Sequence, residues 1–370
     1  MAKERQISYY NIFKYIVKKG ETTRREIEKD TGYSWGTVSS NVCALMDDGF
    51  VKETRNVING VGRSTYYLST NGKYVTIGVD VNAIGLSCTI AEINGKELFF
   101  FTSNFKANNS EEVISLVLST FDKAFEWVGK NYNVFSIGLS CQGGADRETG
   151  FFNHFNFIKD WKPINFKSIL EEKYHIFAII ANDMEALKID YMHKYPLETD
   201  PVSIIRLVDG IGFTFTPLDA VLTNFMRCEF GHMIMNKEGN GCICGKRGCL
   251  ETYASIRGLL NRCNLNISDR EKLFLEQEKY QKYIDEAADY LGLAILNILS
   301  GFVVKKVILT GRMIDFGPKF INDIYSSYTK YRNNSKLNED IEVIGDSSLS
   351  PSLGIAMLSV EEKLDYEKQK

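Results

Sequence analysis

Apolar residues in the first fifty positions recur every three or four residues, and short polar breaks separate these repeats. The first repeat ends at Lys18-Lys19-Gly20 and contains Ile7, Ile12, Phe13, Tyr15 and Ile16. This spacing places the apolar side chains on one face of a helix. Thr22 or Thr23 can cap a second helix over 24–30, because a threonine side chain accepts a hydrogen bond from the first turn. Ser34 can cap a third helix, whose inner face carries Val38, Val42 and Leu45.

The second and third predicted helices are joined by a short turn at Thr31-Gly32. This arrangement predicts a helix-turn-helix, in which the later helix enters the major groove of DNA. Residues 50–53 and 64–68 are typical of two strands, and the segment between them ends in Asn59-Gly60-Val61-Gly62-Arg63. We therefore expect a wing with a basic tip. The alternative is a small three-helix domain with no DNA function.

After Tyr74 the pattern changes to short apolar runs that are typical of strands, with a helical repeat over 110–130. The predicted strands cover 75–80, 86–91, 97–101 and 134–139. Strands mixed with helices in this order predict an α/β lobe. At the other end of the chain, the charged run from Glu361 to Lys370 indicates a solvated helix end or a frayed tail.

The composition is that of an ordinary globular protein, with 44% hydrophobic and 25% charged residues in a chain of 370. Residues 1–70 carry 11 Lys and Arg against 8 Asp and Glu, a charge of +3, and the remainder carries 33 against 39, a charge of −6. A weakly basic module on an acidic body predicts a polyanionic partner for the first part only. The 8 cysteines fit a reducing cytoplasm better than a disulfide framework. We therefore expect a cytoplasmic protein without a membrane partner.

One histidine and three cysteines lie close together in the second half of the chain: His232, Cys242, Cys244 and Cys249. Imidazole and thiolate are the ligands of closed tetrahedral zinc sites. The alternative is three reduced core thiols beside an unrelated histidine, and the tight Cys-x-Cys-Gly-x-x-Gly-Cys spacing argues against it. Because four protein ligands leave no open position for a reactive water, we expect a structural Zn²⁺.

The string from Glu229 to Glu251, Glu-Phe-Gly-His followed by Cys-x-Cys-Gly-x-x-Gly-Cys-Leu-Glu, resembles the signature of the ROK family of sugar kinases and sugar-responsive repressors. Ser-x-x-Thr-Val-Ser at 34–39 and Leu-Met-x-x-Gly-Phe-Val at 45–51 resemble the winged helix of ROK repressors. The resemblance implies an α/β fold in two parts. A winged helix-turn-helix over 1–72 would be followed, over 73–370, by a two-lobed domain of the actin-like ATPase and hexokinase type.

The resemblance also implies a sugar site in the cleft between the lobes. Asn182 and Asp183 match the family position whose Asp is the catalytic base of the kinases, where a carboxylate hydrogen-bonds a sugar hydroxyl. The family uses the positions of Glu229, His232 and Glu251 for sugar hydroxyls, with one imidazole nitrogen on zinc and the other on the sugar. Asn156 is a further candidate at looser spacing. From the residues alone, the Asn182-Asp183 pair is equally an Asx cap on the following helix.

The segments that hold ATP phosphates in ROK kinases are altered here. Asp80-Val81-Asn82-Ala83-Ile84 stands where the kinases have Asp-x-Gly-Gly-Thr, and Thr310-Gly311-Arg312 replaces paired glycines. In the segment over 208–216 Gly210 and Gly212 remain, but two phenylalanines crowd the following turn. Separately from these three segments, Gln142 replaces the proline of the family's Pro-Gly-x-x-Asp loop. Glycines let backbone N–H groups approach a phosphate, so these changes predict that the chain is not an enzyme and has no catalytic residue.

The expected DNA contacts fall into two groups. Phosphates are expected to bind the basic side chains of Arg24, Arg25, Arg55 and Arg63. The third helix has no Lys or Arg, so base readout is expected from residues on or near its outer face, Ser34, Trp35, Thr37, Ser40 and Asn41.

Together these features predict a sugar-responsive transcriptional regulator, most simply a repressor of carbohydrate-utilisation genes. Its partners would be double-stranded operator DNA and a sugar effector. Operators for such domains are usually palindromic, so we expect a homodimer or a higher homo-oligomer. One alternative is an active ATP-dependent sugar kinase with an accessory DNA-binding domain. Another is a regulator whose input is a sugar-transport protein.

Overall fold

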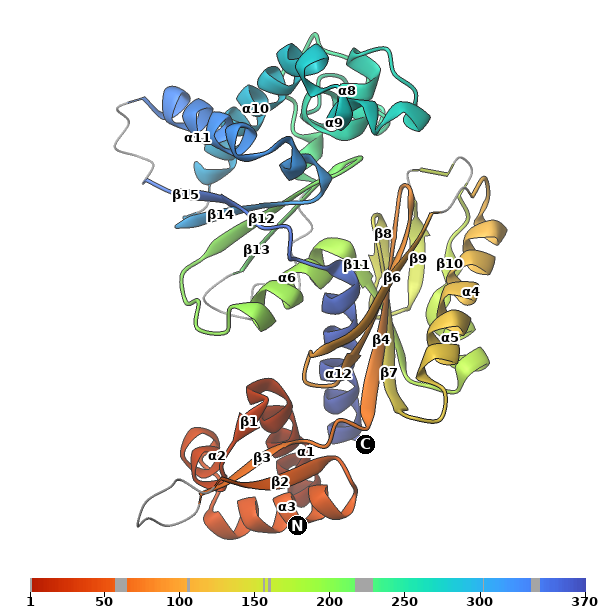
Figure 1. Ribbon diagram of the computed structural model, residues 1–370, viewed down its shortest axis with the longest axis vertical. Coiled ribbons are helices and arrows are strands. Elements are labelled where there is room, and N and C mark those ends of the chain that lie inside the picture. Colours follow the sequence, from red (N-terminus) through yellow and green to blue (C-terminus); the bar gives the residue numbers. More distant parts are fainter. Residues whose placement is uncertain are drawn as a thin grey trace. The chain divides into compact units, whose positions relative to one another are not determined.

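The computed structural model describes residues 2–56, 65–104, 107–155, 157–158, 161–216, 229–301, 303–333 and 340–370. The chain folds into two compact units (Figure 1). Unit 1 comprises Met1–Lys194 and Ser350–Lys370, and unit 2 comprises Tyr195–Leu349. Among the helices described, none is long and apolar enough to cross a membrane.

Unit 1 begins with an N-terminal module of three helices and a small antiparallel sheet of order β1-β3-β2. Its elements are α1 (Ala2–Lys19), β1 (Glu21–Thr22), α2 (Arg24–Thr31), α3 (Trp35–Asp47), β2 (Val51–Asn56) and β3 (Thr65–Thr70). Thr23 caps α2 by accepting the N–H of Glu26, and Ser34 caps α3 by accepting the N–H of Thr37. These elements confirm the predicted helix-turn-helix and the two strands of the wing. The wing tip, including Arg63, lies outside the described residues.

The central sheet of unit 1 has the order β11-β7-β4-β5-β6. Its strands are β4 (Tyr74–Asn82), β5 (Gly85–Glu92), β6 (Glu97–Asn104), β7 (Asn133–Cys141) and β11 (Ala178–Asn182). Strands β4, β7 and β11 run parallel, while β5 and β6 pair antiparallel as a meander. The apolar alternation of β4 places Val75, Ile77 and Val79 in one core with the helices α4 (Ser110–Val128) and α5 (Phe166–Tyr174).

Helices α6 (Asp183–Lys194) and α12 (Pro351–Gln369) pack on the other face of this sheet. Small residues allow the backbones to approach closely. A Cβ added to Gly78 in β4 would lie 1.9 Å from the carbonyl oxygen of Ser352, and one added to Gly354 would lie 1.9 Å from that of Ala186. The backbone of α12 therefore lies in close contact with β4 at one point and with α6 at the other, where a larger side chain would not fit.

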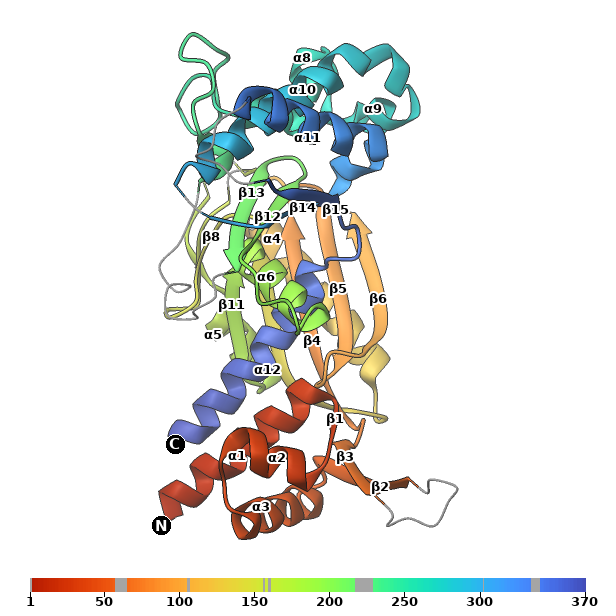
Figure 2. The ribbon, with the colours of Figure 1, turned by 90° about the vertical axis from the view of Figure 1, so that its left-hand side faces the viewer.

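The last part of α12 joins the N-terminal module (Figure 2). Val360 and Leu364 are fully or almost fully buried and belong to the same core as Ile12, Phe13 and Ile16 of α1. Lys14 forms an ion pair with Asp365 at 2.7 Å. The expectation of a solvated helix end or frayed tail was therefore wrong, because one apolar side of this charged helix is covered by α1.

A short sheet of order β10-β9-β8 is formed by the part of the chain between β7 and β11. The turn before β8 lies next to Asn182, in the predicted sugar segment. Its strands are β8 (Gly144–Asp146), β9 (Phe151–His154) and β10 (Ile164–Asn165). Gly143 and Gly144 allow β9 to lie close, since a Cβ on Gly144 would lie 2.0 Å from the imidazole ring of His154.

Unit 2 is built on a four-stranded sheet of order β13-β12-β14-β15 with helices around it. The strands are β12 (Val202–Leu207), β13 (Ile211–Thr216), β14 (Lys306–Thr310) and β15 (Glu342–Gly345). The α-helices are α7 (Glu251–Ala254), α8 (Ile256–Arg262), α9 (Lys272–Leu275), α10 (Gln277–Leu299) and α11 (Pro318–Arg332), and short 3₁₀ turns are η2 (Phe230–His232), η3 (Ile267–Asp269) and η4 (Arg312–Phe316). One continuous core contains side chains of β12, β14, α8, α10 and α11.

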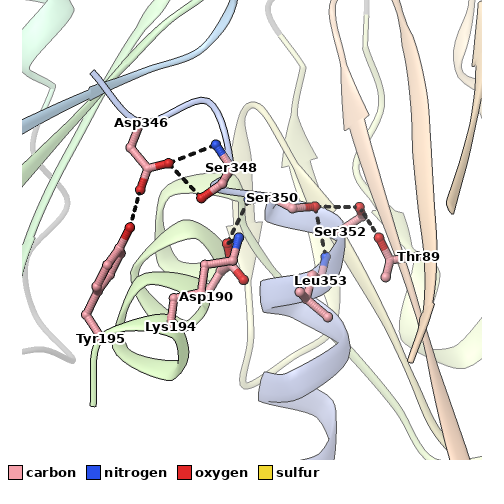
Figure 3. Close-up of polar contacts among 9 residues, drawn as sticks. All are labelled: Thr89, Asp190, Lys194, Tyr195, Asp346, Ser348, Ser350, Ser352 and Leu353. Atoms are coloured by element: carbon pink, nitrogen blue, oxygen red, sulfur yellow. Dashed lines mark hydrogen bonds and ion pairs between the residues drawn. The ribbon is translucent and has the colours of Figure 1, made fainter. Parts of the chain in front are cut away.

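The chain crosses between the units twice, after α6 and before α12. Within each unit, polar contacts join residues near the first crossing to residues near the second (Figure 3). In unit 1, one oxygen of the buried Asp190 accepts from the Lys194 ammonium and from the N–H of Ser350, both at 2.8 Å. In unit 2, the Tyr195 hydroxyl donates to Asp346 at 2.9 Å, and the other oxygen of that carboxylate accepts from Ser348. In each unit, the two chain segments next to the crossings are therefore joined by hydrogen bonds or ion pairs.

Candidate functional site

The four predicted metal ligands are brought together by a 3₁₀ turn and a tight loop of unit 2. His232 ends η2, and the three cysteines lie on a loop closed by bridges between Gly241 and Arg247 and between Ile234 and Cys249. The loop needs glycine at Gly248, which has a φ of 72° and lies so close to Asn236 that a Cβ would be 1.6 Å from its carbonyl oxygen. The Gly-x-x-Gly part of the motif is therefore explained by the loop backbone.

The ligand atoms of His232, Cys242, Cys244 and Cys249 all lie within 4.8 Å of one another. The Sγ of Cys242 is 3.5 Å from Nδ1 of His232, and the Sγ atoms of Cys244 and Cys249 are 3.7 Å apart. This separation is far longer than the about 2.05 Å of a disulfide bond. The cluster could therefore hold a metal ion, as the sequence predicted.

Burial acts on the thiols of this cluster. It raises the pKa of Cys249 to about 12 and also raises the pKa of Cys242. For Cys244 burial works in the same direction, but hydrogen bonds from the Lys246 N–H and from the neighbouring thiols outweigh it and lower the pKa. A metal ion that binds here must therefore displace protons, at least from Cys242 and Cys249.

The second nitrogen of His232 faces away from the thiols. Its Nε2 lies 3.9 Å from Oε2 of Glu229, whose side chain is 74% exposed. Glu251 lies on the other side, with Oε2 at 3.8 Å from Nδ1 and Oε1 accepting the N–H of Ile211 at 3.0 Å. Burial raises the pKa of Glu251, and the nearby His232 opposes this shift. Unit 2 thus brings Glu229, His232 and Glu251 together as the resemblance implies.

Asn182 and Asp183 lie in unit 1, at the junction of β11 and α6. The Asn182 amide donates to the carbonyl of Gly143 at 2.8 Å, and its oxygen accepts the N–H of Met184 at 2.9 Å. Asn182 therefore works as an Asx cap and also fastens the turn between β7 and β8. Asp183 opens α6 and is 4% exposed. Asn156, the remaining sugar candidate, lies outside the described residues.

Residues of the segments expected to match the kinase phosphate loops make polar contacts within the protein. In unit 1, the buried Asp80 accepts from the hydroxyl of Ser140 at 2.7 Å. In unit 2, Asp209 in the β12–β13 turn is 3% exposed and pairs with Arg270 at 3.2 Å. Arg312, which follows Gly311, pairs with Glu271 at 2.9 Å and lies over the Phe274 ring. The sequence analysis missed Arg270, because nothing in its local pattern connects it with a turn sixty residues earlier.

The residues of α3 predicted to contact DNA bases differ in their exposure. Trp35 is 49% exposed, and Ser40 is also exposed, while Thr37 is half-buried beside the capping Ser34. Asn41 is 2% exposed and donates to the Ser8 hydroxyl at 2.9 Å, so the expectation that it lies on the outer face was wrong. Its position is one turn of helix from the buried Leu45, on the side that α1 covers.

The four expected phosphate contacts also differ from one another. Arg25 and Arg55 are exposed. Arg24 is mostly buried and forms an ion pair with Glu53. Arg63 lies outside the described residues.

Comparison with known proteins links this chain to one family. A sequence profile of the ROK family matches residues 76–362. The xylose repressor of Bacillus spizizenii is 25% identical over 383 aligned residues, which cover 96% of this chain and 96% of that repressor. The xylose repressor of Bacillus subtilis is 25% identical over 380 residues, covering 96% of this chain and 95% of its own length.

Solved structures have the same fold. A ROK family transcriptional regulator, described as a homologue of the E. coli Mlc protein, has a TM-score of 0.79 at 19% identity and covers 99% of this chain and 98% of its own. A ROK family glucokinase from Streptomyces griseus, solved with glucose and AMPPNP, has a TM-score of 0.66 at 20% identity and covers 78% of this chain and 99% of its own. These likenesses confirm the predicted fold class.

Proposed function

The chain belongs to the ROK family, and on that premise we propose that it is a sugar-responsive transcriptional regulator, acting as a repressor of carbohydrate-utilisation genes. The observation that carries this proposal is the length of the similarity. The two Bacillus xylose repressors align with 96% of the chain, whereas the glucokinase structure covers 78% of it. The family profile starts at residue 76, after the helix-turn-helix module.

DNA binding is assigned to the N-terminal module. Helix α3 presents Trp35 and Ser40 to the outside, with Thr37 beside them, and Arg25 and Arg55 lie exposed on neighbouring elements. Serine, threonine and indole groups contact base edges, and arginines contact phosphates. Such a protein works in the cytoplasm on double-stranded operator DNA. A symmetric operator requires a homodimer or higher homo-oligomer.

The effector is a monosaccharide, and the names of the relatives make D-xylose and D-glucose the first sugars to test. Its hydroxyls would be bound by Asp183, Glu229, Glu251 and the free side of His232. Asn182 supports this group by fixing the Gly143 turn and the start of α6. Sugar binding changes operator affinity only if the sugar binds one DNA-affinity state better than the other.

Zinc is the metal that fits the Cys/His cluster. A tetrahedral ion with bonds of about 2.3 Å to sulfur and about 2.05 Å to nitrogen separates two sulfurs by about 3.8 Å, and a sulfur from a nitrogen by about 3.6 Å. One such sulfur–sulfur separation here is 3.7 Å and one sulfur–nitrogen separation is 3.5 Å, and all four ligand atoms lie within 4.8 Å of one another. With four protein ligands the ion is structural: it would hold the loop that orients His232 and Glu251.

Phosphoryl transfer is not part of the proposed function. This part of the proposal rests on the sequence of the segments expected to match the kinase phosphate loops, which have lost glycines that let backbone N–H groups approach a phosphate. Two of these segments form the Asp209–Arg270 and Arg312–Glu271 ion pairs within unit 2. The alternatives, an active sugar kinase with an accessory domain and a regulator driven by a sugar-transport protein, become outcomes of the test.

The test uses the full chain. DNA selected from a random-sequence pool is measured by mobility shift with and without D-xylose or D-glucose, and sugar-dependent ATP hydrolysis is measured in parallel. We expect sequence-specific binding that a sugar changes, and no ATP hydrolysis above background. Sugar phosphorylation without specific DNA binding would favour the kinase. Specific DNA binding that no sugar changes would favour a protein input.

A further inference from the structure

Arg147 lies where three segments of unit 1 meet. Its guanidinium Nη1 is 2.7 Å from Oε1 of Glu185, in the first turn of α6, and 3.3 Å from Oε1 of Glu362, on α12. Arg147 itself follows β8 in the turn that leads to β9. One cation therefore joins the β8–β9 turn, the start of α6 and the last part of α12.

One of these segments, the start of α6, carries the proposed sugar ligand Asp183, and the β8–β9 turn lies next to it. The β8–β9 turn is closed by the Asp146 carboxylate, which accepts the N–H groups of Glu148 and Thr149. On the other side of β8, the Gly143 carbonyl accepts from Asn182, next to Asp183. The segment that leads into the turn is thus hydrogen-bonded, through Gly143 and Asn182, to the residue next to Asp183.

The third segment holds the N-terminal module. Glu362 lies between Val360 and Leu364, which are both buried in the core of that module. The same stretch of α12 contacts α1 through the Lys14–Asp365 ion pair and through the Gln6 amide, which donates to the Glu367 carbonyl at 2.9 Å. A displacement of α12 at Glu362 therefore moves the surface on which α1 rests.

We propose that the Arg147–Glu362 ion pair couples the sugar site to the DNA-binding module. The inference rests on the proposed function and names its regulation. In one state of the protein Arg147 binds both Glu185 and Glu362, and in the other a movement of the β8–β9 turn takes Arg147 away from Glu362. Because the sugar favours one of these states and operator DNA the other, the ion pair contributes to the difference in affinity.

The exposure of the three side chains suits such a switch. The side chains of Arg147, Glu185 and Glu362 are 29%, 30% and 38% exposed. Water can therefore hydrate these charges when the ion pair opens, without a large desolvation cost. Ion pairs of this kind change an equilibrium by a factor of about 1.5 to 5. Burial lowers the pKa of Lys188, one turn along α6; Glu185 opposes this shift and Arg147 adds to it.

The experiment measures the ratio of operator dissociation constants with and without sugar. Glu362→Gln and Arg147→Met each remove the ion pair, and the double variant tests whether they act through each other. Lys173→Met is the matched control, because it breaks an exposed ion pair of unit 1, Lys173–Asp122 at 2.7 Å, that does not involve α12. The probes are D-xylose, D-glucose and a duplex selected from a random pool by the full chain.

We expect each single variant to move the ratio toward one by about 1.5- to 5-fold, and the double variant to change it no further. By linkage, the ratio of sugar dissociation constants with and without DNA must change by the same factor. A purely structural role would lower the melting temperature and leave both ratios unchanged.

Ratios equal to the wild-type ratio in folded Glu362→Gln overturn the inference and leave the proposed function intact. An equal change in Lys173→Met also overturns it. A wild-type protein whose DNA binding responds to neither sugar overturns the proposed regulation by these sugars, and this inference with it.

Discussion

Replacement of Leu364 by alanine tests whether α12 stabilises the N-terminal module. Leu364 is 1% exposed and lies in the core formed with Ile12, Phe13 and Ile16. Leucine-to-alanine changes in protein cores cost about 2–5 kcal/mol, with the smaller values where the surroundings can close around the lost side chain. Leu364 lies in the last turns of α12, where the helix end can shift, so we expect about 2–3 kcal/mol.

This loss should be local, because unit 2 has a separate core. Native-state hydrogen exchange resolves it, since amides report the free energy of the opening that exposes them. Amides of α1 and α3 that exchange through opening of the module should exchange about 30- to 150-fold faster, which is 2–3 kcal/mol converted to an equilibrium constant. Amides of β12 and β14 should keep their wild-type rates.

Leu275→Ala is the control, because it makes the same chemical change at a position that is 83% exposed. It should alter exchange in α1 and α3 by less than about twofold. Equal acceleration in β12 and α1 for Leu364→Ala would refute the reasoning, since it would mean that the chain opens as a whole. Unchanged exchange in α1 would refute it as well.

Three further predictions follow from individual contacts. Purified protein should contain one zinc per chain by elemental analysis, and Cys244→Ser should lower both zinc content and melting temperature; a fully stable, zinc-free protein would contradict the assignment. Burial raises the pKa of the Asp190 carboxyl, so the folded protein keeps this proton to a higher pH than the unfolded chain, and stability is lost as the pH rises from the ordinary pKa of aspartate through the raised pKa. Asp190→Asn should remove this pH dependence. If the melting temperatures of the two proteins changed with pH in the same way between pH 4 and 8, the assignment would be contradicted. Arg25→Ala should weaken binding to operator and to random DNA alike, and should reduce the slope of log binding constant against log salt concentration by about one. Ser40→Ala should reduce only the preference for the operator sequence. Mobility shifts at several salt concentrations distinguish the two effects.

Much of the fold could be predicted because its determinants are local. The caps at Thr23 and Ser34 and the spacing of the apolar residues define α2 and α3 within a few positions. The metal cluster is local in the same sense. Its three cysteines lie on one loop, and the glycines between them set the backbone that brings the sulfurs together.

The rest depends on partners that are distant in the sequence. Asn41 has a polar side chain, which on a surface helix is expected to face solvent. Its amide has a buried partner because Ser8 of α1 packs against it. The run after Glu361 is charged on most sides, so its single buried Leu364 is too weak a pattern to reveal the contact with α1. Arg270 similarly has no local feature that points to Asp209.

The small residues of α12 show why this helix suits a role in regulation. At its start, Ser352 and Gly354 bring its backbone against β4 and α6, and Ser359 bonds Thr76 and Ser136 of the central sheet at 3.0 and 2.8 Å. Beyond Ser359 the contacts change to the apolar core and ion pairs of the N-terminal module. The first half of α12 is thus fixed to the sheet, and its second half, which carries Glu362, forms the surface on which α1 rests. The sequence of α12 therefore separates the part that must stay fixed from the part that can respond.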